Sequence, residues 1–200
     1  LVGRYGDAVL TKMSQDGSRL LWSTFLGGSY GDYGYRVFLG PGDHVTAAGI
    51  TASSNFPVTA GSFGTVNKGP LGMDLSVDGF VTRLTSDGAN LIYSGFIGGI
   101  DLDIIMALHV EVNGEVLVGG TTTSNDLPTP PGSFMPKGPI HTSAFNGFVS
   151  RISSDGSNIL WSTYIGGGAV DNVIGLKVRP DGNLVLLGGT GSRELRFTPG

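Results

Sequence analysis

Three stretches of the chain repeat one another at nearly every position. They are Asp7 to Gly28 (DAVLTKMSQDGSRLLWSTFLGG), Asp78 to Gly99 (DGFVTRLTSDGANLIYSGFIGG) and Asn146 to Gly167 (NGFVSRISSDGSNILWSTYIGG). The spacing between them defines a unit of about 70 residues. A unit of this length used repeatedly is typical of an array or a propeller, and it argues against a single catalytic core.

The composition fits a protein rich in strands and turns. Of 200 residues, 35 are Gly, 40% are hydrophobic and only 14% are charged, which excludes a disordered chain. The net charge of −4 is spread without long runs, so nucleic acid and anionic membranes are poor partners. The absence of Cys excludes disulfides and thiolate metal sites. Leu1 is neither an initiator Met nor the start of a signal segment, so we expect a fragment of a longer chain.

Each unit begins with a strand, a hairpin turn and a second strand. The first strand is short and β-prone, and the second covers Leu20 to Leu26, Leu91 to Ile97 and Ile159 to Ile165. Asp-Gly pairs between them have the chemistry of a hairpin turn, since Asp bonds the local backbone and Gly takes a positive φ. These structural positions are Asp16, Gly17, Asp87, Gly88, Asp155 and Gly156. A Gly-Gly pair ends each second strand, namely Gly27, Gly28, Gly98, Gly99, Gly166 and Gly167.

Two more strands complete each unit. The third centres on Val37, Leu108 and Leu176, and the fourth holds Val45 to Ala48, Val116 to Gly119 and Leu184 to Leu187. Four strands per unit, with hairpin signals and no helical period, predict an all-β fold of propeller blades. We place the blades near residues 7–77, 78–145 and 146–200.

The phrases DGFVTRLTSDG, LIYSGFIGG and WSTYIGG, with the FP and GSF motifs of the links, resemble the bacterial β-propeller repeat family known as SBBP. The resemblance covers nearly the whole chain. It implies a large exported or cell-surface bacterial protein whose repeats form blades without an assigned catalytic activity. The chain departs from the family in long links at Asn67 to Val77 and Lys137 to Phe145, and in a divergent loop at Ile100 to Met106.

Three blades cannot close a ring, because propellers have about four to eight blades. We therefore expect the ring to be completed by further blades of the parent chain or by blades of other subunits. No cofactor and no metal is predicted, since His44, His109 and His141 occupy unrelated repeat positions without ligand spacing.

Two sets of repeated side chains are candidate binding residues. Asp32, Asp103 and Asp171 follow the Gly-Gly pairs, and they form either a ring of carboxylates for a cation or sugar, or local anchors for their own loops. Trp22, Tyr93 and Trp161 either stack on sugars or belong to the core between blades.

Other chemistry has weaker support. Lys12, Arg83 and Arg151 share a repeat position. There they either receive an acidic ligand, or they pair with a neighbouring carboxylate or lay their stems over apolar surface between blades. Gly27-Gly28-Ser29-Tyr30-Gly31 matches the G-x-S-x-G pattern of serine nucleophiles, but a strand-like segment follows it where a helix is required.

No catalytic residue is therefore predicted. The sequence predicts a non-catalytic scaffold, or a module that binds a protein or a surface polymer. The alternatives are a lectin-like propeller and a fragment of a lyase or glycosidase propeller whose active site lies in other blades.

Overall fold

The computed structural model of the protein describes residues 6–69, 77–138 and 145–195. These residues form twelve strands and one short 3-10 turn, η1 (Pro41–Asp43). All strand pairs are antiparallel. The strands are β1 (Ala8–Met13), β2 (Leu20–Leu26), β3 (Asp32–Leu39), β4 (Val45–Thr51), β5 (Asp78–Leu84), β6 (Leu91–Ile97), β7 (Asp103–Val110), β8 (Val116–Thr122), β9 (Asn146–Ile152), β10 (Ile159–Ile165), β11 (Asp171–Val178) and β12 (Leu184–Thr190).

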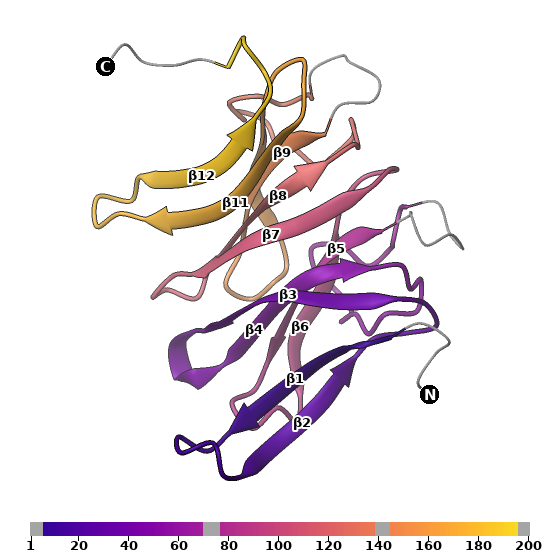
Figure 1. Ribbon diagram of the computed structural model, residues 1–200, viewed down its shortest axis with the longest axis vertical. Helices are drawn as coiled ribbons and strands as arrows, with labels where there is room; N and C mark the ends of the chain where they lie inside the picture. Colours follow the sequence, from indigo (N-terminus) through magenta and orange to yellow (C-terminus); the bar gives the residue numbers. More distant parts are fainter. Residues whose placement is uncertain (1–5, 70–76, 139–144, 196–200) are drawn as a thin grey trace.

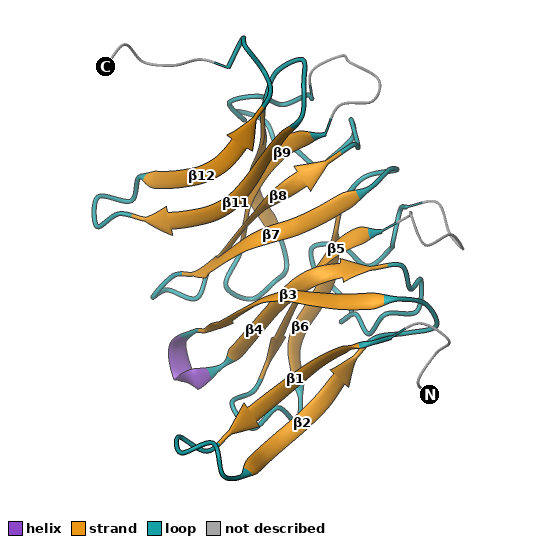
Figure 2. Ribbon diagram, in the orientation of Figure 1, coloured by secondary structure: helices purple, strands orange, loops and turns teal. Residues whose placement is uncertain are grey.

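The all-β prediction is confirmed, with four strands in each unit (Figure 2). The second strand of every unit has the predicted bounds, and the fourth strand extends to Thr51, Thr122 and Thr190. One local prediction is wrong, because β7 begins at Asp103 inside the segment expected to be a loop at Ile100 to Met106. Asp103 is the first residue of that strand and its side chain is buried. The prediction failed because Asp was expected to lie in an exposed loop.

The sheets do not coincide with the sequence units. β3-β4-β5-β6 and β7-β8-β9-β10 are four-stranded sheets, and each takes two strands from one unit and two from the next. β1-β2 and β11-β12 form separate two-stranded sheets at the two ends (Figure 1). Consecutive units are therefore joined by strand pairing, at β4–β5 and at β8–β9.

The joining strands are the most buried of the molecule. Every residue of β4, β5 and β8 is buried, as is every residue of β9 except Arg151. Their sequences are rich in Val, Ala, Thr and Gly, which suits strands covered on both faces and paired on both edges. The two central strands of each complete sheet thus come from consecutive units.

One glycine position is required by the close approach of two strands. The register of β3 and β4 shifts between Gly34 and Arg36, and the same shift recurs in β7–β8 and β11–β12. Opposite it, a Cβ added at Gly49 would lie 1.9 Å from the Tyr33 carbonyl oxygen. Gly120 and Gly188 stand at the same repeat position with equally close contacts, so this bulge is a feature of the repeat.

The hydrophobic core lies between neighbouring sheets. β7 packs against β3, β4 and β5, and β11 packs in the same way against β7, β8 and β9. The largest core cluster contains Val81, Tyr93, Ile105, Val118 and Phe148, all of them 2% exposed or less. The sheets follow one another in sequence order along the long axis of the molecule (Figure 1).

The links between units cover the outer edge of the complete sheets. The Thr59 N–H donates to the Ser94 carbonyl, and the Phe96 N–H donates to the Gly64 carbonyl, so this link pairs with β6. In the next unit the Tyr164 N–H donates to the Met135 carbonyl, and that link pairs with β10. Such cover protects an edge strand from pairing with another chain. Most of the two long links noted at Asn67 to Val77 and Lys137 to Phe145 lies outside the described residues.

Candidate functional site

The three repeated aspartates are buried anchors of their loops. Asp32, Asp103 and Asp171 are 1%, 0% and 2% exposed. In each unit one carboxylate oxygen, Oδ2, accepts from the N–H of the second glycine of the Gly-Gly pair, at 2.8 Å. The same oxygen accepts from the hydroxyl of Ser53, Ser124 or Ser192, at 2.9, 2.9 and 2.7 Å. These contacts are those of the loop-anchor alternative, and the side chains are not open to a ligand in solution.

A second acidic or amide side chain faces each of these aspartates across the first glycine of the pair. A Cβ added at Gly98 would lie 2.6 Å from Asp78 Oδ1 and 2.7 Å from Asp103 Oδ2. At Gly27 the corresponding atoms belong to Asp7 and Asp32, and at Gly166 to Asn146 and Asp171. The first two units therefore hold a pair of carboxyl groups where the third holds an amide and a carboxyl.

The burial of the Asp78–Asp103 pair changes its acidity. Burial raises the pKa of Asp103 to about 7, and the charge of Asp78 adds to the rise while hydrogen bonds from Gly99 and Ser124 oppose it. Burial also raises the pKa of Asp78 to about 6, against the bonds from the N–H groups of Lys68 and Gly69. Burial likewise raises the pKa of Asp32. The pair therefore keeps a proton at pH values where an ordinary carboxyl is ionised.

Each of the two carboxyl pairs consists of two side chains, Asp7 with Asp32 and Asp78 with Asp103. Among the described residues there is no group of three or more His, Cys, Asp or Glu side chains that could hold a metal ion. In the Asp78–Asp103 pair, burial outweighs the charge of Lys68, so the two groups are better matched to one shared proton than to two negative charges. Their chemistry is therefore that of a structural acid pair.

Two of the three repeated aromatic residues, Trp22 and Tyr93, contact the hairpin turn of the following sheet. The Trp22 Nε1–H donates to the Ser86 carbonyl at 3.3 Å, beside the Asp87-Gly88 turn. Tyr93 is 2% exposed, and a Cβ added at Gly156 would lie 2.2 Å from its Cγ atom. Trp161 packs against the cluster of Ala107, Leu117 and Leu176. Tyr93 presents no face on which a sugar could stack, and the geometry is that of the core between sheets.

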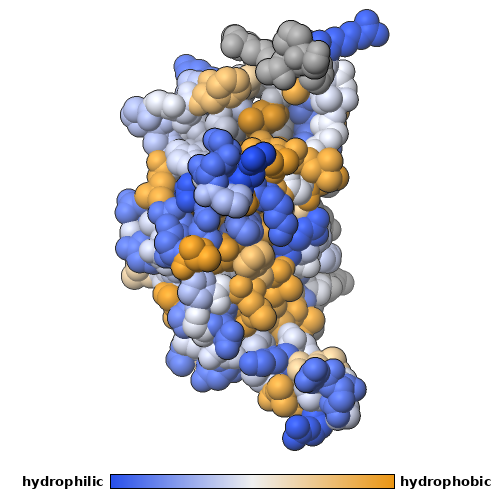
Figure 3. Space-filling model, turned by 90° about the vertical axis from the view of Figure 1, so that its left-hand side faces the viewer, coloured by the Kyte–Doolittle hydropathy of each residue, from blue (hydrophilic) through white to orange (hydrophobic). Residues whose placement is uncertain are grey.

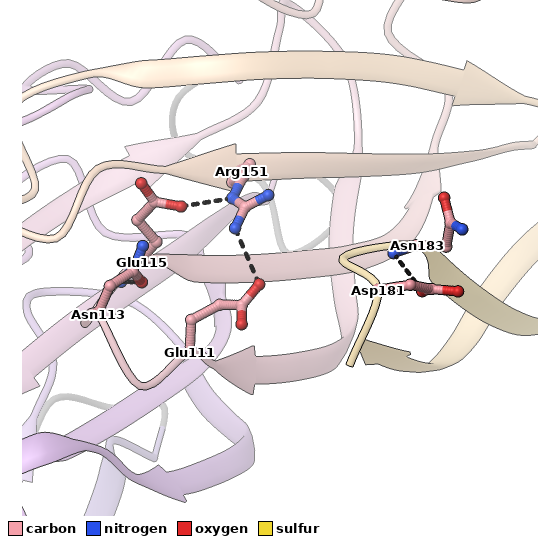
Figure 4. A network of polar contacts seen from close by, with 6 residues as sticks. All are labelled: Glu111, Asn113, Glu115, Arg151, Asp181 and Asn183. Atoms are coloured by element: carbon pink, nitrogen blue, oxygen red, sulfur yellow. Dashed lines mark hydrogen bonds and ion pairs between the residues drawn. The ribbon is translucent and has the colours of Figure 1, made fainter. Parts of the chain in front are cut away.

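Two of the three repeated cations also have structural partners. The Arg83 side chain is buried and donates from Nη1 to the Gly114 carbonyl at 2.8 Å. Arg151 pairs with Glu111 at 2.8 Å and with Glu115 at 2.6 Å, on either side of the β7–β8 turn (Figure 4). Lys12 is exposed. Arg151 therefore pairs with nearby carboxylates, which was one of the two alternatives, and the set does not converge on a ligand.

The Asp-Gly turns form as predicted. Gly17, Gly88 and Gly156 have φ values of +69°, +70° and +71°. Side-chain bonds from Ser14 and Ser18 lower the pKa of Asp16 to about 2, and bonds from Ser153 and Ser157 do the same for Asp155. The Ser29 motif is followed by strand β3 and not by a helix, so it lacks the setting of a serine nucleophile.

The hairpins β3–β4, β7–β8 and β11–β12, which we name the inner hairpins, line one open cavity of about 670 Å³. Equivalent segments contribute to it: Phe38 to Pro41, His109 to Val112, and Val178 to Pro180. His109 lies edge-on to Phe38, with ring centroids 5.1 Å apart, and burial lowers the pKa of its imidazole. Val112 is 95% exposed at the rim. Figure 3 looks onto the side of the molecule where the hairpin turns lie, and hydrophobic patches alternate there with polar surface.

Comparisons with known proteins leave the family open. No protein-family model matches the chain, and no curated protein matches its sequence. The described part of the chain also has no helix long and apolar enough to cross a membrane. The resemblance to bacterial propeller repeats thus rests on the repeat motifs themselves.

Two features of the site were not predicted from the sequence: the side chains that face the repeated aspartates, and the cavity. Asp7, Asp78 and Asn146 open the three repeated stretches, so their shared position was visible, but only the fold shows that each faces the aspartate after the Gly-Gly pair. The cavity joins segments about 70 residues apart, and a single sequence contains no signal that they meet.

Proposed function

We propose that the chain is a non-catalytic module of propeller type from an exported or cell-surface bacterial protein, and that it serves as a scaffold that binds a protein or surface polymer. The observation that carries this proposal is the sharing of each complete sheet between two consecutive units. Successive sheets also pack on one another, since β7 contacts β3, β4 and β5 and β11 contacts β7, β8 and β9, and this packing supports a blade-like arrangement. The exported location rests on the resemblance alone.

The cavity of the inner hairpins is the binding surface that the geometry favours. Three equivalent segments meet there, its lining is largely apolar, and His109, Glu111 and Arg179 add polar groups at its wall. Concave, mostly apolar sites with a few polar groups are where ligands usually bind. The repeated aspartates and aromatics, by contrast, serve the fold, and no residue arrangement in the described part of the chain favours an enzyme or a lectin over this module.

The test is binding to a glycan array and to an immobilised peptide library. Val112→Asp introduces a charge at the rim of the cavity, and we expect it to reduce binding of any retained probe at least about ten-fold. The matched control is Val66→Asp, a change at another exposed valine, which lies in a link and is 67% exposed. Equal loss in both variants, or no loss in Val112→Asp, would contradict a binding role for the cavity.

A further inference from the structure

The chain contains two Asn-Gly pairs, Asn113-Gly114 and Asn146-Gly147. At such a pair the backbone nitrogen of the glycine can attack the side-chain amide of the asparagine, because glycine has no Cβ to hinder the approach. The attack closes an imide ring, so it needs space around the pair and freedom of the local backbone. Only one of the two pairs lies where both conditions are met.

Asn113 is exposed in the turn between β7 and β8 (Figure 4). The Glu115 N–H donates to Asn113 Oδ1 at 3.0 Å, and the Gly114 N–H donates to the Glu111 carbonyl at 2.9 Å. The first bond folds the side-chain carbonyl of Asn113 toward the backbone that follows it. Its carbon is thereby held on the side of the Gly114 nitrogen, which becomes free to attack when the exposed turn opens locally.

Asn146-Gly147 begins strand β9 and is paired on both edges of that strand. Asn146 is 5% exposed. Gly147 faces Thr121 of β8 and Ile165 of β10. A Cβ added at Gly147 would lie 2.7 Å from the Ile165 carbonyl oxygen, so the strand leaves no space for a new ring. This pair can react only after the sheet opens.

The third unit shows that the same turn accepts an aspartate. Asp181-Gly182 occupies the repeat position of Asn113-Gly114 (Figure 4). The Gly182 N–H donates to the Arg179 carbonyl at 2.9 Å, and the Asn183 N–H donates to Asp181 Oδ1 at 3.0 Å, as in the second unit. Both glycines have a positive φ, of +88° and +81°. An aspartate at position 113 therefore fits the existing backbone of the turn.

We infer that Asn113 is a site of spontaneous deamidation, and that Asn146 in the folded protein is not. The Gly114 nitrogen gives up its proton and bonds to Cγ of Asn113, while the bond from Cγ to Nδ2 breaks and Nδ2 leaves as ammonia with that proton. Water then opens the imide ring at either of its carbonyl carbons. Addition at Cγ gives aspartate, and addition at the main-chain carbon gives isoaspartate. Solvent water is the only co-reactant, and the inference does not depend on the proposed function.

The new carboxylate enters a turn whose arginine is already shared by two acidic groups. Arg151 pairs with Glu111 at 2.8 Å and with Glu115 at 2.6 Å. In the third unit Asp181 pairs with Arg179 at 3.3 Å, and the repeat position of Arg179 is held by Glu111 in the second unit. Deamidation therefore places a like charge beside Glu111, where the third unit has an opposite charge. Glu111 lines the cavity, so the charge of the cavity wall changes as well.

Isoaspartate has a further effect, because it adds one atom to the main chain between Asn113 and Gly114. The Gly114 carbonyl accepts a hydrogen bond from Arg83 Nη1 at 2.8 Å, and Arg83 is 4% exposed. Displacement of this carbonyl removes a hydrogen bond from a buried cation, which is costly. A reaction in an exposed turn thus reaches the contact between the two complete sheets.

The test is peptide mass mapping of the folded protein after increasing times at mildly alkaline pH. We expect Asn113 to convert at least about ten-fold faster than Asn146, because only Asn146 must wait for a sheet to open. In urea that unfolds the chain, the two pairs should convert at rates within about two-fold of each other. Equal rates in the folded protein, or conversion of Asn113 only in urea, would overturn the inference.

Asp181→Asn is the matched gain of a site. It places an asparagine before Gly182 in a turn with the same hydrogen bonds, and we expect conversion there within about three-fold of the rate at Asn113. Asn113→Gln is the matched loss, because its longer side chain must close a larger ring, and conversion at position 113 should stop. If Asp181→Asn stays unmodified while Asn113 reacts, the turn geometry does not select the site and the inference fails.

The effect of the added charge is measured with Asn113→Asp, which carries one of the two products. We expect this variant to unfold at a lower urea concentration than the unchanged protein. Asn183→Asp makes the same change of charge in the third turn, near Arg179, and should leave the unfolding midpoint nearly unchanged or raise it. Equal downward shifts in the two variants would contradict the like-charge contact with Glu111.

Discussion

At the scale of single residues, the paired carboxyls behind the Gly-Gly loops are the feature with the clearest chemical consequence. The third unit carries Asn146 where the second carries Asp78, and both lie beside a buried aspartate. The amide of an asparagine can donate a hydrogen bond as a protonated carboxyl does. The repeat thus contains its own comparison between a pair of two carboxyl groups and a pair of one carboxyl and one amide group.

The pair predicts a loss of stability as the pH rises. The folded-state pKa values of Asp78 and Asp103, about 6 and about 7, lie above the ordinary value of 3.8. The folded state therefore binds more protons, and its free energy of unfolding should fall between about pH 4 and pH 7. Asp78→Asn should remove much of this fall and raise the free energy of unfolding at pH 8 by about 2 kcal/mol, measured by urea unfolding.

The reciprocal change provides the control. Asn146→Asp creates a second carboxyl beside Asp171 and should lower stability at pH 8 more than at pH 5. A stability curve that is flat from pH 4 to pH 8 in the unchanged protein, or Asp78→Asn without effect on it, would contradict the shared proton.

At the scale of elements, two of the three Asp-Gly turns contact the sheet before them. Tyr93 of β6 packs on Gly156, in the turn between β9 and β10, and Trp22 of β2 packs on Gly88 in the same way. The first turn, at Gly17, has no neighbour within 4 Å of an added Cβ. The three turns therefore have the same backbone conformation, but they differ in their contacts with neighbouring side chains.

This difference gives a matched pair of substitutions. Gly17→Ala meets only the positive φ, which costs about 1–2 kcal/mol. Gly156→Ala meets the same φ and also the Tyr93 ring, and the added overlap should raise the total cost to about 3 kcal/mol or more. Urea unfolding of the two variants measures the difference, and equal losses would show that Tyr93 is not held by this turn.

The elements were the part of the fold most readily predicted from the sequence. Hydrophobic runs bounded by Asp-Gly and Gly-Gly pairs place β2, β6 and β10 within the chain, because those signals are local. The pairing of β4 with β5 was not predicted, since a unit was taken to begin where the repeated motif begins. Hydrogen bonding across a link of more than twenty residues leaves no local pattern, and the same holds for the contact between Asp78 and Asp103.

At the scale of the whole molecule, equivalent repeat positions at the ends and in the middle carry similar apolar residues but differ in how exposed their side chains are. The same repeat position is core in one unit and surface in another, as Phe80 and Val9 illustrate. An open array of shared sheets explains this, because only interior units have a hairpin on both sides.

Amide hydrogen exchange, resolved strand by strand in dilute protein, tests the sharing of sheets most directly. β5 and β9 are interior strands paired on both edges, whereas β1, their equivalent, is paired with β2 alone. We expect slow exchange throughout β5 and β9, and fast exchange at the amides of β1 that do not face β2. Equal exchange in β1, β5 and β9 would contradict the central claim, because it would mean that each unit forms its own separate sheet.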